Sequence, residues 1–157
     1  MLFRSGVFRT DAAFGSGDAD RFGRPDPSSL LWKMQEAAGA HYEALGFGTA
    51  VIAAHGCFWA LARTELEIAE PLPADEPLAL DTWSGRAGHG LYRRHYRLQR
   101  PGGGVIARSV GVWVLMDRET RQLAEDRSWL PEPDVISQPG VETYLKNKEM
   151  AKEYGNF

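Results

Sequence analysis

The chain has 157 residues, 43% of them hydrophobic and 25% charged, which is the size and composition of one folded domain with its own core. A formal net charge of −3 does not favour nucleic-acid binding, and no apolar run approaches the ~20 residues that a membrane span needs. An arginine and polar residues interrupt the N-terminal segment where a secretory signal has an apolar core, and a single cysteine excludes an internal disulfide. We therefore expect a cytoplasmic protein with neither nucleic-acid nor membrane partners.

The first half of the chain predicts a strand, a loop and a long helix. Residues 3–14 alternate loosely as in a strand, and the Gly, Asp, Ser and Pro of residues 15–27 indicate a loop. Asp26 or Ser28 is placed to cap a helix that ends at Gly46. Apolar residues recur on one stripe of this helix: Leu30, Leu31, Met34, Ala37, Ala38, His41, Tyr42 and Leu45. Trp32 falls on the opposite face, which indicates a second surface, against a partner subunit or a ligand.

After the helix the period changes to two, which predicts an antiparallel sheet. The expected strands are residues 57–68, 78–84, 91–100 and 105–116, with residues 122–125 as a possible continuation. The strand at 105–116 is apolar on both faces except for Arg108, as an interior strand would be. One helix covers only one face of such a sheet, so the α+β fold that we predict is a helix wrapped by a curved sheet and completed by dimerisation.

Three segments resemble the acyl-ACP thioesterase family. They are LLWKMQEAAGAHYEALGFG, FWALARTELEIAEPLPADEPLALDTWSG and GGGVIARSVGVWVLMDRETRQL, in the family's order. The resemblance implies a single hot-dog domain over residues 1–135, followed by a tail at 136–157 whose composition is helical. It also implies a fatty acyl thioester of acyl carrier protein or coenzyme A as substrate. We expect a homo-oligomer, as a dimer or a dimer of dimers.

The chain departs from the family in its length. Family members usually carry two hot-dog repeats, and the matching segments are those of the first repeat. The family's catalytic Asn-x-His motif belongs to the second repeat. The asparagines of this chain are Asn147 and Asn156, both in the tail, so no catalytic residue can be carried over from that motif. The resemblance therefore implies the fold and the ligand class but leaves the chemistry open.

Four residues are candidates for catalysis of thioester hydrolysis, which needs a base or nucleophile and donors for the developing oxyanion. Asp20 precedes the helix, where hot-dog enzymes place an acidic residue, although a turn residue in a Gly-rich loop is the alternative. Glu36 shares the outer face of the helix with Trp32, and the alternative is a surface carboxylate. His55 and Gly56 enter the first long strand, where an exposed amide would serve an oxyanion; the alternative is an ordinary loop and turn.

The remaining reactive side chains are assigned structural roles. Asp18 is the exception: it is a second, less favoured candidate for the catalytic role proposed for Asp20. His41 is expected to be a hydrogen-bonded core residue, His89 a loop residue, and His95 part of a basic face. Cys57 has no activating pattern and is expected to be buried and unreactive. The sequence has no metal-ligand spacing, nucleophile elbow or phosphate loop, so neither a metal nor a cofactor is expected.

The residues expected to bind substrate fall into an apolar group and a basic group. The apolar slot for the acyl chain is assigned to Met34, Trp59, Trp83, Val112 and Trp113, although the same residues suit a plain core. Six arginines lie between positions 86 and 108 without an intervening acid: Arg86, Arg93, Arg94, Arg97, Arg100 and Arg108. They indicate either a solvated strand face or a docking surface, in which Arg93 and Arg94 meet phosphopantetheine or the carrier protein.

Three functions follow from these residues, in order of preference. The first is hydrolysis of an acyl-ACP or acyl-CoA thioester at a dimer interface. The second is a non-catalytic domain that binds an acyl chain or an acyl carrier, which the missing Asn-x-His motif favours. The third is a hot-dog dehydratase or hydratase with His55 as its base.

Overall fold

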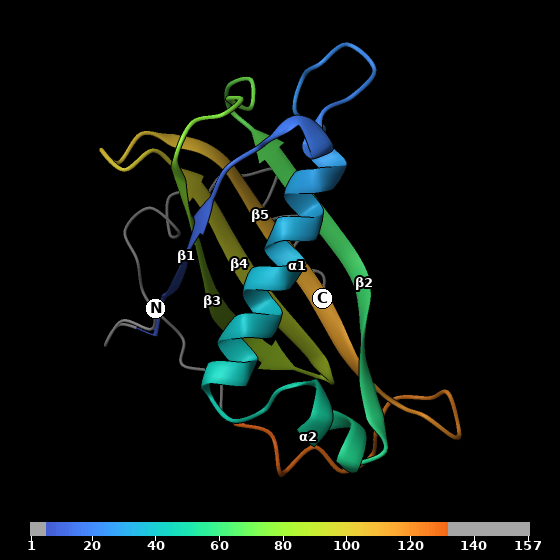
Figure 1. The fold of residues 1–157 in the computed structure, drawn as a ribbon. Helices are drawn as coiled ribbons and strands as arrows, with labels where there is room; N and C mark the ends of the chain where they lie inside the picture. Colours follow the sequence, from blue (N-terminus) through green and yellow to red (C-terminus); the bar gives the residue numbers. More distant parts are fainter. Residues whose placement is uncertain (1–5, 132–157) are drawn as a thin grey trace.

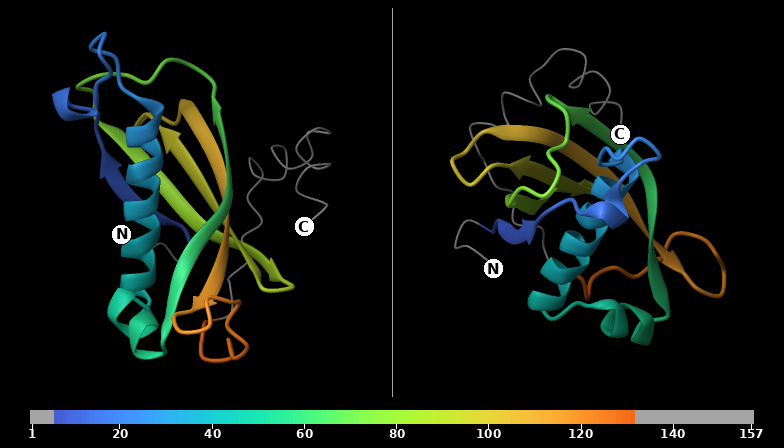
Figure 2. Two further views of the ribbon diagram at one scale, coloured as in Figure 1. Left: turned by 90° about the vertical axis from the view of Figure 1, so that its right-hand side faces the viewer. Right: turned by 45° about the horizontal axis from the view of Figure 1, so that its top comes forward.

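Helix α1 lies along one face of a curved antiparallel sheet (Figure 1). The structure is a computed structural model and describes residues 6–131. Its elements are β1 (Phe8–Ala12), a 3₁₀ turn (Ser16–Asp18), α1 (Pro27–Ala44), α2 (Thr49–Ala54), β2 (Cys57–Ile68), β3 (Leu78–Gly88), β4 (Leu91–Gln99) and β5 (Val105–Asp117). The strand order is β1-β3-β4-β5-β2. Figure 2 shows the sheet curving around the helix, so the predicted hot-dog arrangement is confirmed.

Helix α1 begins and ends where its sequence signals predict. The Asp26 carboxylate accepts a hydrogen bond from the Ser28 amide at 2.8 Å, and Pro27 occupies the first turn. Gly46 follows the helix with φ +86°, the left-handed conformation that favours glycine at this position. The buried residues of the helix all belong to the predicted stripe: Leu30, Met34, Ala37, Ala38 and His41. They pack on sheet residues that include Leu80, Tyr96 and Leu98.

The strands agree closely with the sequence pattern, and the differences occur at their ends. β2 spans the predicted residues, while β3 continues past residue 84 through a register shift to Gly88. β1 is shorter than the predicted strand, and the expected extension near residues 122–125 is a single bridge between Met116 and Leu123. β5 pairs with β4 and β2 and is therefore an interior strand, as predicted. Helix α2 was not predicted, since six residues are too few for a periodic signal.

The arginine-rich segment does not form one surface. Successive side chains of β4 alternate between the two faces of the sheet, so Arg94 faces α1 while Arg93 and Arg97 face away from it. Arg97 donates to the Asp81 carboxylate at 2.8 Å, and Arg100 is paired with Glu70 and Glu76. The expectation of a single basic docking face is therefore wrong for Arg94, Arg97 and Arg100.

Asp81 organises the sheet face away from α1. Its side chain is completely buried, and it accepts hydrogen bonds from Arg9, Arg97 and Gln99 at 2.6 to 3.1 Å. Burial alone raises the pKa of this carboxyl, but the hydrogen bonds from the two arginines outweigh it and hold the pKa below its ordinary value. The network joins β1, β3 and β4 across the sheet.

Within residues 6–131 no helix is long and apolar enough to cross a membrane. The same residues contain no group of three or more His, Cys, Asp or Glu side chains that could hold a metal ion. The predicted helical tail at 136–157 lies outside the described residues, so the proposed boundary at residue 135 stays a prediction.

We expect Asp81→Asn to lower the free energy of unfolding by about 3 kcal/mol, because it removes the buried charge to which Arg9 and Arg97 both donate. Urea unfolding followed by circular dichroism measures the change. Glu76→Gln is the control, since it removes an exposed partner of Arg100 and should cost less than about 1 kcal/mol. Equal losses in the two variants would show that the Asp81 network contributes no more than a surface pair.

Candidate functional site

A cavity of about 350 Å³ lies at the C-terminal end of α1, between that helix, α2 and the sheet. This volume is in the range of small-molecule sites. The residues around it come from α1, α2, strands β2 to β5 and the loops after α1 and β5: Gln35, Ala38, Gly39, Tyr42, Phe47, Gly48, Thr49, Ile52, Ala53, Cys57, Phe58, Trp59, Ser84, Gly85, Tyr92, Arg93, Arg94, Trp113 and Arg118. Most of these residues are apolar or aromatic. Within residues 6–131 the lining contains no Asp, Glu or His, so this part of the chain offers space for an acyl chain but no side-chain base.

Aromatic side chains form much of the wall. The Trp59 ring meets the Tyr92 ring edge-on at 5.1 Å and is tilted against Tyr42 at 5.7 Å. Trp113 lies beside them, on the neighbouring strand β5. This arrangement holds an apolar surface rigidly open because each ring is supported by another.

Arg94 is the one buried cation of this lining, with 3% of its surface exposed. Its Nη1 donates to His41 Nδ1 at 2.9 Å and to Thr82 Oγ1 at 3.2 Å, and its Nη2 donates to Ser84 Oγ at 3.1 Å. The guanidinium carbon lies 4.9 Å from the centre of the Tyr42 ring. Within residues 6–131 no carboxylate forms an ion pair with it.

His41 is a neutral hydrogen-bond acceptor. Arginine can only donate, so the bond from Arg94 requires an unprotonated Nδ1 and places the ring proton on Nε2. Burial, with the nearby Arg94 charge as the next cause, lowers the pKa of His41 to about 4. The ring also stacks on Phe8 with its centroid 5.3 Å away. The predicted role of His41 as a hydrogen-bonded core residue agrees with these contacts.

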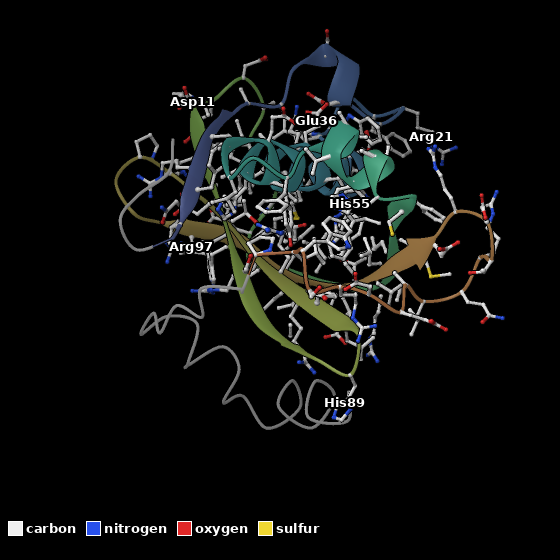
Figure 3. All side chains as sticks on the ribbon, turned by 90° about the horizontal axis from the view of Figure 1, so that it is seen from below. Asp11, Arg21, Glu36, His55, His89 and Arg97 are labelled. Carbon is white, nitrogen blue, oxygen red and sulfur yellow. The ribbon has the colours of Figure 1, made fainter. Side chains whose placement is uncertain are left out.

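His55 and Gly56 lie close to the cavity, between two of its lining residues in the chain, Ala53 and Cys57. The His55 ring stacks on Trp129 at 3.8 Å, and its Nδ1 is 3.0 Å from the Val51 carbonyl oxygen. Figure 3 shows His55 between α2 and the segment after β5. The Gly56 amide already donates to the Ala53 carbonyl at 2.9 Å, so it is not the unpaired donor that an oxyanion would need.

Asp20 and Glu36 lie elsewhere. The Asp20 carboxylate accepts from the Phe22 and Arg24 amides at 2.8 and 3.0 Å, which is the turn role given as the alternative. It precedes the N-terminus of α1, and the helix is about 27 Å long, so the cavity is at the other end. Glu36 is exposed and accepts from the Trp32 indole at 2.9 Å. Figure 3 shows it on the side of α1 away from the sheet.

The predicted substrate-binding residues divide into two groups. Trp59, Trp113, Arg93 and Arg94 line the cavity, although the alternation of β4 turns the Arg93 side chain to the other face of the sheet. Met34 belongs to the core under α1, and the buried Trp83 stacks on His95, on the other face of the sheet from α1, with centroids 5.6 Å apart. Two further cavity residues, Tyr92 and Arg118, were not predicted from the sequence. The alternation of β4 would have indicated Tyr92, because it is two residues from Arg94 and shares its face.

Residues 6–126 match the family model described as the acyl-ACP thioesterase N-terminal domain. The chain belongs to the acyl-ACP thioesterase family. The three segments of the sequence resemblance all fall within the matched range, so the assignment to the first repeat of this family is confirmed. No curated protein matches the sequence.

Solved thioesterases share the fold at low sequence identity. An acyl-ACP thioesterase from Bacteroides thetaiotaomicron has a TM-score of 0.70 and 22% identity, over 85% of this chain and 57% of its own. The 12:0-ACP thioesterase from Umbellularia californica has a TM-score of 0.68 and 22% identity, over 86% and 54%. A 1,4-dihydroxy-2-naphthoyl-CoA thioesterase from Synechocystis has a TM-score of 0.69 and 17% identity, over 79% and 93%. The chain thus spans about half the length of the acyl-ACP thioesterases that it matches.

We expect stability to fall as the pH drops from 6.5 to about 4. His41 and His95 both have pKa values lowered to about 4, chiefly by burial, so between these limits the unfolded state binds more protons than the folded state. Their contribution is complete above pH 6.5 and is lost as the pH falls through 4. Urea unfolding at a series of pH values measures how the free energy of unfolding depends on pH. The slope should correspond to the uptake of nearly two protons on unfolding. His41→Gln keeps an acceptor for Arg94 and should remove one of them; an unchanged slope would contradict the assignment.

Proposed function

We propose that this domain takes part in hydrolysis of a fatty acyl thioester and holds the acyl chain in the cavity at the end of α1. The observation that carries the proposal is the aromatic cavity in a chain that belongs to the acyl-ACP thioesterase family. The substrate class is an acyl thioester of acyl carrier protein or coenzyme A. The similar structures include an acyl-ACP thioesterase and a 1,4-dihydroxy-2-naphthoyl-CoA thioesterase, which supports both carriers.

The reaction adds water to the thioester carbonyl and expels the thiol. A base removes a proton from the attacking water, the carbon–sulfur bond breaks, and the departing thiolate takes up a proton. In this reaction Arg94 and the tyrosine rings bind the substrate and do not act as bases. Burial, with Asp117 and Asp126 as further causes, raises the pKa of the Cys57 thiol, so Cys57 does not serve as the nucleophile.

Among the candidate bases, His55 has the most favourable position. It is next to the cavity wall, and Asp126 lies near it: hydrogen bonds from Ser128, with His55 as a smaller cause, lower the pKa of Asp126. Asp20 and Glu36 act on this cavity only if a second copy of the domain brings them to it. We therefore propose His55 as the base. Asp20 and Glu36 are the alternative bases, which would act only in the assembled oligomer.

We propose a homodimer formed at strand β2. This strand is twelve residues long, lies at the edge of the sheet, and therefore leaves one side of its backbone without a neighbouring strand. Leu61 and Ile68 on it are 38% and 37% exposed. The opposite edge, β1, has only five residues. A second copy that pairs with β2 would extend the sheet and cover these side chains. We place this homodimer in the cytoplasm.

A non-catalytic acyl-binding domain is the second candidate. The observation in its favour is the absence of any Asp, Glu or His from the residues around the cavity. A domain of this kind would bind the chain and leave the chemistry to another protein or repeat. The dehydratase alternative needs a histidine paired with an acid at the reacting carbon, and it draws support from His55 beside Asp126 alone.

Hydrolysis is tested by incubating the purified chain with decanoyl-CoA and decanoyl-ACP and following thiol release. We expect turnover, and we expect His55→Gln to lower kcat by about 10²-fold or more with little change in chain binding, because a general base is lost. Asp20→Ala and Glu36→Ala are run beside it. A loss of activity confined to the Asp20→Ala or the Glu36→Ala variant would instead assign the base to that acid, at the oligomer interface. Measurable decanoyl binding without thiol release, in the wild type as in the variants, would refute hydrolysis and support the acyl-binding domain.

The dimer is tested by sedimentation. We expect the wild type to sediment as a dimer and the Leu61→Lys, Ile68→Lys double variant as a folded monomer, since two charges on the edge oppose strand pairing. Trp32→Lys is the control, because Trp32 is 62% exposed on the outer side of α1. A dimer that survives the β2 variant but not Trp32→Lys would place the interface on α1.

A further inference from the structure

Arg94 is a buried positive charge whose partners are all neutral. Among the described residues these partners are the Nδ1 atom of a neutral His41 and the hydroxyls of Thr82 and Ser84. A guanidinium taken out of water needs more than dipoles to offset its lost hydration, and in proteins a buried arginine is usually matched by a carboxylate or another anion. With 3% of its surface exposed, Arg94 keeps little of its hydration by solvent.

Two indoles that line the same cavity have N–H groups without an acceptor. The Nε1 atoms of Trp59 and Trp113 are buried and have no hydrogen-bond partner within the described residues. Trp59 and Arg94 are both in contact with Tyr42, whose ring is 5.7 Å from the indole and 4.9 Å from the guanidinium carbon. The Trp59 indole and the Arg94 guanidinium thus both lie beside the Tyr42 ring, and a buried donor such as the indole N–H is ordinarily satisfied.

The chemistry that satisfies such a site is an anionic oxygen group attached to an apolar chain. A carboxylate has two acceptor oxygens and matches a guanidinium through short, charge-assisted bonds. The remaining lining is apolar and aromatic, as the tail of the ligand requires. No carboxylate among the cavity residues competes for Arg94.

We propose that Arg94 anchors the carboxylate of a free fatty acid, whose chain fills the cavity between α1 and the sheet. Trp59 donates the second hydrogen bond to the same head group. The proposal deepens the proposed function, since a free fatty acid is the product of hydrolysis, and it makes the domain a receptor for that product as well. Retained product would then occupy the space that the next acyl chain needs.

The test compares ligands of one chain length that differ in their head group. Decanoate, decanol and methyl decanoate are titrated into the wild type, and binding is followed by tryptophan fluorescence or calorimetry at neutral pH. We expect decanoate to bind at least about tenfold more tightly than either neutral ligand, which corresponds to about 1.4 kcal/mol for one charge-assisted contact. Equal affinities for the acid and the alcohol would overturn the proposal without any variant.

Variants then assign the preference to Arg94. Arg94→Met should reduce the ratio of acid to alcohol affinity to about one while decanol still binds, and Arg94→Lys should keep part of the preference. Arg24→Met is the control, because this arginine is on the exposed loop before α1 and should leave the ratio unchanged. A preference for decanoate that persists in Arg94→Met would refute the assignment.

The outcome is separable from that of the proposed function. The titration uses no thioester, so a chain that prefers decanoate through Arg94 but releases no thiol sustains this inference and refutes hydrolysis. A chain that hydrolyses decanoyl-CoA but binds decanoate no better than decanol does the reverse.

Discussion

The positive charge between α1 and the sheet is the constraint on which the site depends. Arg94 is on β4 and points toward the helix, where an apolar side chain would be expected. Burial of this charge is costly, and two neighbouring elements supply polar groups to it: α1 supplies His41, and β3 supplies two hydroxyls. These bonds tie the end of the helix to the middle of the sheet.

The cavity follows from the same arrangement. Toward its N-terminal end α1 packs directly on Leu80, Leu98 and their neighbours, which leaves no room for a ligand. Toward its C-terminal end the polar cluster around Arg94 and the rings of Tyr42 and Trp59 prevent such close packing. Helix α2 and the start of β2 then close the space from the side. The domain is thus divided into a packed half, which stabilises it, and an open half, in which we propose that the acyl chain binds.

The two faces of the sheet have different electrostatic roles. On the face away from α1, Asp81 accepts hydrogen bonds from Arg9 and Arg97. On the face toward α1, the hydrogen-bond partners of Arg94 among the described residues are neutral. This contrast separates a structural ion network from the cation that we propose as the ligand site, even though Arg94 and Arg97 are three residues apart on one strand.

The sequence by itself determined the helix, the four long strands and the family. Each of these depends on local signals: the Asp26 cap, the glycine after the helix, and the alternation of β2 to β5. The predicted slot residues Trp59 and Trp113, with Arg93 and Arg94, do line the cavity. The sequence pattern could not separate a slot from a core, because both are made from the same residue types.

Only the tertiary structure decided which end of α1 carries the cavity and which side chains surround it. Met34 and Trp83 are as apolar as Trp59, but Met34 packs from α1 into the core and the alternation of β3 places Trp83 on the far face of the sheet. Asp20 and His55 are both polar loop residues, and the length of α1 separates them. In the sequence Arg94 is one of six arginines between positions 86 and 108, and only the alternation of β4 shows that its side chain faces the helix. The physical reason is that burial and charge compensation arise from contacts between segments distant in the chain, which no local pattern records.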